Sequence, residues 1–170
     1  MDAWGEPIDK SDWGDGPWQN EPDEMSWSFG DVLCRIVRNP HGGSLNGYIS
    51  VPKSHPWYET EQDSLYDLDV HGGVTFAGRF AHSTHATPTE ADLEVWWIGF
   101  DCAHSGDRSP GFEALGRQRG SPWPIFGNDT YKHIEYVRRE VEMLARQAIA
   151  ALRAQVDLQR LKDLYAEFAE

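Results

Sequence analysis

The sequence has few cysteines, no long apolar run and few basic residues, and each scarcity excludes a class of protein. Two cysteines in 170 residues, Cys34 and Cys102, are too few for a disulfide framework. Both lie in predicted strands, which favours reduced thiols. No apolar run approaches the roughly 20 residues of a membrane-spanning helix, and the N-terminus lacks a basic segment followed by an apolar one. We therefore expect a cytoplasmic protein that does not enter a membrane.

Positive charge is also scarce. The formal net charge is −13 and the isoelectric point is near 4.8. Duplex DNA and anionic membranes would repel most of such a surface, so direct binding to either is not expected. A carboxylate-rich surface can instead occupy a basic nucleic-acid channel on another protein, which keeps open a direct inhibitor of a nucleic-acid enzyme.

The familiar catalytic signatures are missing as well. The chain has no Walker loop, no nucleophile elbow, no H-E-x-x-H and no paired C-x-x-C. These absences remove many nucleotide hydrolases, serine hydrolases and zinc proteases. Any site must therefore be built from less specific patterns.

The length fits one domain with a single core. The residue pattern predicts an α+β fold: a small, mainly antiparallel sheet with an irregular acidic N-terminal arm and one long C-terminal helix. We divide the chain into the arm at 1–31, a sheet domain with a long loop at 32–128, and an amphipathic helix at 129–170 that is a candidate for oligomerisation.

The arm at 1–31 combines acidic residues with tryptophan. Its acids far outnumber Lys10, and glycine and proline interrupt any periodicity, which predicts irregular structure. A solvated tail has little use for large apolar rings. We expect the arm to pack on the domain, with docking of a partner as the alternative, through its tryptophans Trp4, Trp13, Trp18 and Trp27.

Alternating and β-branched residues begin at Leu33. Strands are predicted at 33–38 and 45–51, joined by a Gly-rich turn, and the alternation at 65–70 and the run at 74–76 have the same character. The most apolar strand, at 93–100, is expected to be central. The polar segment at 78–92, with His82 and His85, is expected to be an exposed loop. Glycine and proline at 102–128 argue against a long regular element.

A helix is predicted to begin just after the N-capping residues at 128–130. Its apolar stripe comprises Ile134, Val137, Val141, Leu144, Ala148 and Ala151, and after Gln155 it resumes at Leu158, Leu161, Tyr165 and Phe168. A helix of nearly 40 residues would span roughly 60 Å, more than this sheet can cover. Either its distal half projects and finds a partner, most simply itself, or the helix kinks near Gln155 and folds back.

Candidate site residues gather in two turns. In the first, His71 precedes Gly72 and Gly73, whose backbone can approach a ligand closely, and Thr75 follows. In the second, Asp101 and His104 follow the apolar strand at a spacing of three, and Asp107 repeats the interval. Imidazole and carboxylate suit zinc, manganese or iron, so His71, Asp101 and His104 are candidate ligands of a divalent metal, with Asp107 or His55 as additional ones. The same groups can hold a nucleotide, with Trp96 or Trp97 as an apolar wall.

Several motifs resemble those of a family of uncharacterised small proteins encoded by bacteriophages and prophages. The motifs are W-G-x-G-P-W at 13–18, G-Y-x-x-V-P-x-x-H-P at 47–56, V-H-G-G-x-T-F at 70–76, G-F-D-C-A-H-x-G-D at 99–107, and the run 136–141. The resemblance covers residues 13 to about 147. It implies a protein that acts in the cytoplasm of the infected host cell, for example in counter-defence. It implies no mechanism.

Three functions are therefore weighed. The first is a non-catalytic binder of a small phosphorylated or nucleotide-like ligand, held by His71 and the Gly72–Gly73 amides. The second is a metal-dependent phosphoester hydrolase that uses the His/Asp cluster. The third is a direct inhibitor of a host protein, acting through the acidic arm and the projecting helix.

Overall fold

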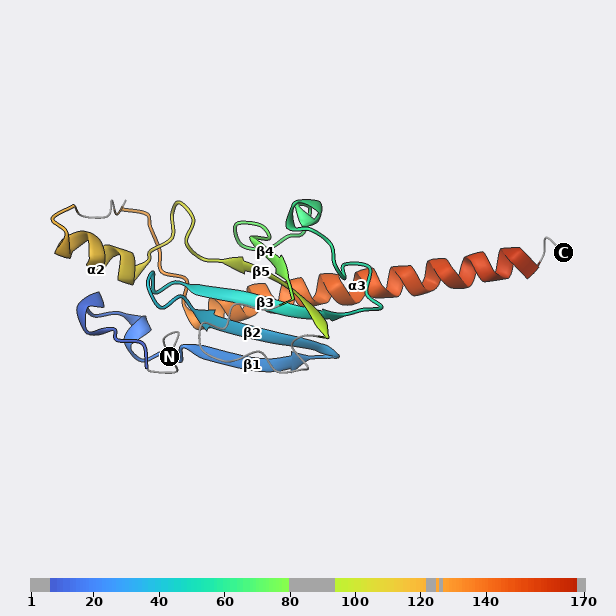
Figure 1. Ribbon diagram of the computed structural model, residues 1–170, viewed down its shortest axis with the longest axis horizontal. Helices are drawn as coiled ribbons and strands as arrows, with labels where there is room; N and C mark the ends of the chain where they lie inside the picture. The colour runs from blue at the N-terminus through green and yellow to red at the C-terminus, as the bar shows by residue number, and fades with distance from the viewer. Residues whose placement is uncertain (1–6, 80–93, 122–124, 126, 168–170) are drawn as a thin grey trace.

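The computed structural model describes residues 7–79, 94–121, 125 and 127–167, and it has an α+β fold. A five-stranded antiparallel sheet has the order β1-β2-β3-β5-β4 (Figure 1). The strands are β1 (Glu24–Phe29), β2 (Val32–Arg38), β3 (Leu45–Pro52), β4 (Phe76–Gly78) and β5 (Val95–Asp101). This confirms the predicted fold class. Trp4, Phe168 and most of the loop expected at 78–92, with His82 and His85, lie outside the described residues.

The strands predicted at 33–38, 45–51 and 93–100 correspond to β2, β3 and β5. The middle strand is β3 rather than β5, which lies between β3 and the short edge strand β4. Strand β4 begins at Phe76, so the run at 74–76 only leads into it. Apolar character predicted that β5 is interior, but it could not give its position in the sheet.

Strand β1 is a difference from the irregular structure expected through residue 31. Met25, Trp27 and Phe29 are partly buried and alternate with more exposed residues, which is the period of a half-buried strand. These three side chains pack against the main core. Composition indicated irregular structure here, whereas the two-residue period would have indicated a strand.

The alternation at 65–70 does not form a strand. The 3-10 helix η3 (Gln62–Leu65) and turns occupy this stretch. Leu65 and Val70 are buried, and the backbone of Asp69 pairs with the side-chain amide of Gln147, which donates to the Asp69 carbonyl and accepts from its N–H at 2.8 and 3.0 Å. The apolar residues therefore face the core without a neighbouring strand.

The long helix α3 (Ile134–Glu167) covers one face of the sheet (Figure 1). The predicted stripe is buried at its first five positions, from Ile134 to Ala148, while Ala151 is half-buried. The main core joins this stripe to β2, β3 and β5. A Cβ at Gly47 would lie 2.6 Å from the Val141 side chain, so glycine permits this close packing.

The helix starts later than its predicted capping residues at 128–130. Its first N–H, from Ile134, donates to Glu21 Oε1 at 2.9 Å, and the Tyr136 N–H donates to His133 Nδ1 at 3.3 Å. A residue of the N-terminal arm therefore caps the helix, a tertiary contact that local sequence does not reveal.

Beyond Leu152 the helix leaves the sheet and extends as one continuous element to Glu167 (Figure 1). The projecting alternative thus describes the structure, and the alternative of a kink and return near Gln155 does not. No described helix combines the length and the apolar character required to cross a bilayer.

The arm lies against the sheet domain through a second, smaller cluster. The 3-10 helices η1 (Ser11–Trp13) and η2 (Pro17–Gln19) contribute Trp13 and Trp18, both buried with Ala114. Ala114 belongs to α2 (Pro110–Gln118), a short helix inside the segment where no long element was expected. Proline at the first helical position is tolerated because its missing N–H would be unpaired there.

Candidate functional site

The first of the two predicted turns follows Val70. The Gly73 N–H donates to the Val70 carbonyl at 2.9 Å, and both glycines have positive φ, +66° for Gly72 and +83° for Gly73. A Cβ at Gly72 would overlap the His104 ring, whereas one at Gly73 would meet nothing within 4 Å. Gly72 is therefore the position where the two turns touch.

The second turn follows β5 and is stabilised by its own carboxylates. Asp101 Oδ1 accepts from the Ala103 N–H at 2.9 Å, and Asp107 Oδ2 accepts from the His104 N–H at 3.0 Å. The Asp107 N–H in turn donates to the His104 carbonyl at 2.9 Å. These bonds aim the Asp107 carboxylate at the interior of the turn.

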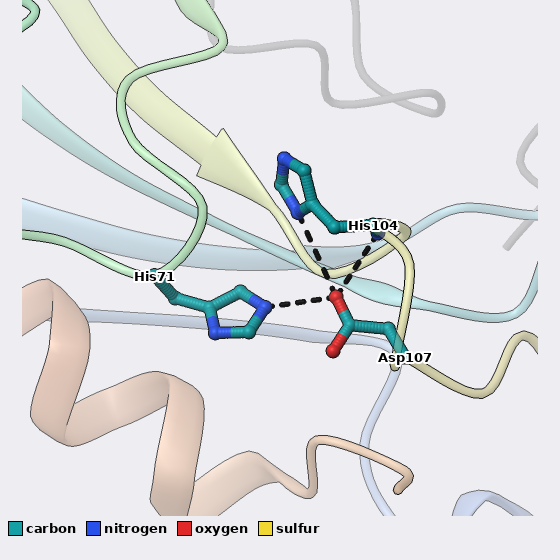
Figure 2. Close-up of side chains that lie close together, drawn as sticks. All are labelled: His71, His104 and Asp107. Carbon is teal, nitrogen blue, oxygen red and sulfur yellow. Dashed lines mark hydrogen bonds and ion pairs between the residues drawn. The ribbon is translucent and has the colours of Figure 1, made fainter. Parts of the chain in front are cut away.

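His71, His104 and Asp107 meet between the turns (Figure 2). His71 Nε2 lies 2.8 Å from Asp107 Oδ2, and His104 Nδ1 lies 3.6 Å from the same oxygen. The three donor atoms all lie within 4.8 Å of one another. The Asp107 side chain is 3% exposed, while those of His71 and His104 are 15% and 33% exposed. The cluster is thus buried at its carboxylate and open at His104.

Helix α3 and the residues before it support this cluster. Tyr136 Oη lies 3.0 Å from His71 Nδ1, and Glu140 Oε2 accepts from the His71 backbone N–H at 2.8 Å. Lys132 Nζ lies 3.4 Å from Asp107 Oδ1. Since a carboxylate only accepts, His71 Nε2 donates to Asp107, and in the neutral imidazole Nδ1 accepts from the Tyr136 hydroxyl. Burial and the nearby Glu140 raise the pKa of Tyr136, which keeps this hydroxyl protonated.

His104 Nδ1 is a buried atom without a hydrogen-bond partner. Its distances to Asp107 Oδ2 and Asp101 Oδ1, 3.6 and 3.8 Å, are too long for hydrogen bonds. A buried nitrogen without a hydrogen bond is unfavourable unless a water molecule or an ion binds it. It points toward the Asp107 carboxylate that His71 also contacts (Figure 2).

The structure brings together only some of the predicted site residues. His71, Gly72 and His104 are in contact, and Asp101 lies beside His104. Gly73 shapes the first turn, and Thr75 donates its N–H to the Gly99 carbonyl at 2.9 Å.

Trp97 is not part of the cluster. It is fully buried in a separate group with Val37 and Tyr48, and the Arg35 guanidinium lies 5.1 Å from its ring centroid. Neighbouring residues of a strand point to opposite faces, and Ile98 points into the main core under α3. Trp97 therefore points away from that core, and Trp96 packs against the core instead.

His55, the additional candidate ligand, also lies elsewhere. Its Nε2 is 2.9 Å from the Ala148 carbonyl and its Nδ1 accepts from the Trp57 N–H at 3.0 Å. It lines a cavity of about 280 Å³ beside Ile149 and Leu152. Ala148 is two helical turns from Glu140, roughly 12 Å along α3, so His55 cannot join His71.

Sequence reasoning gave Asp107 a secondary role and overlooked Tyr136, Glu140 and Lys132. Tyr136 and Glu140 belong to a motif of the family resemblance, and this was the available signal. The cysteines are poor candidates for chemistry. Both are buried free thiols; burial raises the pKa of Cys34 to about 12 and also raises that of Cys102.

No protein-family model matches this chain, and no curated protein or solved structure is significantly similar to it.

Proposed function

We propose that the protein binds a divalent transition metal, with zinc the best fit, through His71, His104 and Asp107. The observation that supports this most is the convergence of three donor atoms within 4.8 Å, one of them the unpaired His104 Nδ1. Bonds of about 2.0–2.1 Å in a tetrahedral zinc site place neighbouring ligand atoms roughly 3.3 Å apart. The contacts of 2.8 and 3.6 Å to Asp107 Oδ2 bracket that separation.

The surrounding contacts match those that orient metal ligands. A histidine that ligates through Nε2 carries its proton on Nδ1 and donates it to a neighbouring acceptor. Tyr136 Oη lies in that position, 3.0 Å from His71 Nδ1. Metal binding would therefore replace the His71–Asp107 hydrogen bond and reverse the direction of the His71–Tyr136 bond.

A site with three protein ligands keeps a coordination position for water, and zinc lowers the pKa of such a water to about 7. The His104 side chain is 33% exposed, so the cluster lies next to solvent although His104 Nδ1 itself is buried. We therefore favour the metal-dependent phosphoester hydrolase among the three functions considered. The motifs resemble those of phage proteins, which would act inside a host cell. We therefore propose that the substrate is a small nucleotide-like molecule that the host uses in defence.

The charges around the cluster favour a cation over a metal-free anionic ligand. Asp107 contacts both histidines, Asp101 lies 3.8 Å from His104, and Glu140 accepts from the His71 N–H. The one nearby cation among the described contacts, Lys132, approaches Asp107 at 3.4 Å. A phosphate alone would be repelled by these carboxylates. A bound metal ion would neutralise part of this negative charge and provide a contact for phosphate. The hydrolase therefore requires a metal ion, whereas the non-catalytic binder does not.

Zinc titration of the purified full chain by calorimetry tests the site. We expect one zinc ion per chain, and a loss of at least about tenfold in affinity for His71→Gln, His104→Gln and Asp107→Asn. His41→Gln is the matched control because His41 is exposed and lies in another turn. Binding that is absent in the wild type, or unchanged in all three variants, would rule out this site.

Hydrolysis of bis(p-nitrophenyl) phosphate with and without chelator tests the activity. The hydrolase proposal expects release of p-nitrophenol that stops with chelator and in His104→Gln. Zinc binding without turnover of this probe or of cyclic and linear dinucleotides would retain the metal site and reject the hydrolase. Retention of a small phosphorylated molecule in the presence of chelator would support the metal-free binder instead.

A further inference from the structure

The projecting half of α3 carries an apolar stripe that the protein's own sheet does not cover. Its members recur at steps of three, four, three and four residues: Ala151, Ala154, Leu158, Leu161 and Tyr165. Leu158, Leu161 and Tyr165 are 54%, 51% and 72% exposed. A repeat of this spacing is the pattern of a coiled-coil seam, in which every such residue meets a neighbouring helix.

The exposed stripe begins at the edge of the face that packs on the sheet, at Ala151, and turns away from it. At 100° per residue, its centre is rotated by about a quarter of a turn from the centre of Val137, Val141, Leu144 and Ala148. A helix docked on the stripe would therefore lie beside the sheet rather than in its place. Two domains can be joined through this surface without disturbing their cores.

We propose that the stripe binds the same stripe of a second copy, forming a parallel two-helix coiled coil. With Ala151, Leu158 and Tyr165 at a positions, Asp157 is at g and Lys162 at e. In a parallel pair, each g residue faces the e residue five positions further along the partner. Asp157 of each chain then meets Lys162 of the other, an opposite-charge pair on both sides of the seam. An antiparallel pair would not bring these positions together.

Within its own helix, Asp157 has only a weak ion-pair partner that could compete with Lys162 of the second copy. The Asp157 carboxylate lies 3.9 Å from Arg160 on the same helix, with both side chains more than 70% exposed, so this pair stabilises the monomer little. The seam is short, roughly 21 Å from Ala151 to Tyr165. A dimer that depends on protein concentration is therefore expected.

Sedimentation of the full chain across a range of concentrations tests the proposal. The mass should rise from 19.3 kDa toward twice that value. Leu161→Asp should weaken dimerisation at least about a hundredfold. Val156→Asp is the matched control: Val156 is 43% exposed on the same helix but opposite the seam, so its variant should dimerise normally. A monomeric wild type, or equal effects of the two variants, would overturn the proposal.

The parallel orientation of the two helices is tested separately, with charge-reversed variants that are expected to remain folded. Asp157→Lys alone and Lys162→Asp alone should each dimerise less, because like charges then face each other. Their equimolar mixture should form heterodimers above the roughly half expected from random pairing, measured by native mass spectrometry. A random mixture, with both single variants dimerising as well as the wild type, would overturn the parallel pairing. Circular dichroism confirms that all variants remain helical, and zinc binding by the variants keeps this result independent of the metal site.

Discussion

At the scale of single residues, the site depends on a contact between two turns that are far apart in sequence. Gly72 and His104 meet where a Cβ would overlap the imidazole ring, and His71 and Asp107 share a hydrogen bond of 2.8 Å. Sequence spacing within each turn predicted Asp101 with His104. The contact across the turns instead selected Asp107, because the second turn folds its own carboxylate inward onto the His104 N–H.

Alanine substitutions at Gly72 and Gly73 distinguish two destabilising effects, the overlap of a Cβ with the His104 ring and the strain of a positive φ. Both have positive φ, but only Gly72 faces the His104 ring. Gly73→Ala should lower the free energy of unfolding by about 1 kcal/mol through strain, and Gly72→Ala by about 2–3 kcal/mol, because the ring must also move. Urea denaturation measures both values. Gly72→Ala should also weaken zinc binding, and equal effects of the two substitutions on stability and on zinc would contradict the contact between the turns.

At the scale of elements, α3 is attached to several loops by side-chain-to-backbone hydrogen bonds. Gln147 pairs with the Asp69 backbone, Glu140 accepts from the His71 N–H, and His55 contacts the Ala148 carbonyl. The helix therefore positions the loop that carries His71 as well as covering the sheet.

The His55 bond predicts a pH dependence of stability. Burial lowers the pKa of His55 below its usual 6.5, and the neutral ring satisfies both nitrogens, donating to Ala148 and accepting from Trp57. The unfolded chain therefore binds this proton more readily than the folded one. The contribution to stability is complete above about pH 6.5 and is lost as the pH falls toward the folded-state pKa.

Urea denaturation of wild type and His55→Gln at about pH 7.5 and about pH 5.5 measures this contribution. The wild type should lose more stability between the two pH values than the variant does. His41→Gln, which removes an exposed histidine, should match the wild type. A drop of the same size in His55→Gln would assign the pH dependence to other groups.

At the scale of the whole molecule, Arg38 connects the arm, the sheet and the helix. The guanidinium is fully buried and donates to Asp23 at 2.7 Å, to Glu21 at 3.1 Å and to Tyr131 at 2.6 Å. Glu21 also caps α3 through the Ile134 N–H. One cation thereby holds two carboxylates of the arm against the domain.

Arg38→Met should be strongly destabilising, since it leaves the Glu21 carboxylate without its cation and leaves Asp23 with Lys10 alone. We expect a loss of about 3–5 kcal/mol in the free energy of unfolding and faster proteolysis around residues 11–23. Arg153→Met is the control, because Arg153 is exposed on the projecting helix. Unchanged protection of the arm in Arg38→Met would show that Trp13 and Trp18 hold it without the ion pairs.

The sequence by itself determined the features that depend on local periodicity. Alternating and β-branched residues predicted β2 and β3, an apolar run predicted β5, and steps of three and four residues predicted the stripe of α3. Spacing along the chain sets which face is buried, although the alternation at 65–70 did not produce a strand. The sequence also showed that histidine and carboxylate residues are concentrated in two turns.

Only the tertiary structure decided which of those groups meet. It placed Asp107 rather than Asp101 between the histidines, moved Trp97 away from the cluster, brought Tyr136 and Glu140 to His71, and made Glu21 the cap of α3. For Asp107 with His71, for Tyr136 and Glu140, and for Glu21 the physical reason is the same: each is a contact between segments distant in sequence, whose partners are selected by how the turns, sheet and helix pack. Trp97 lies elsewhere because residues alternate between the two faces of β5, and only packing decided which face α3 covers.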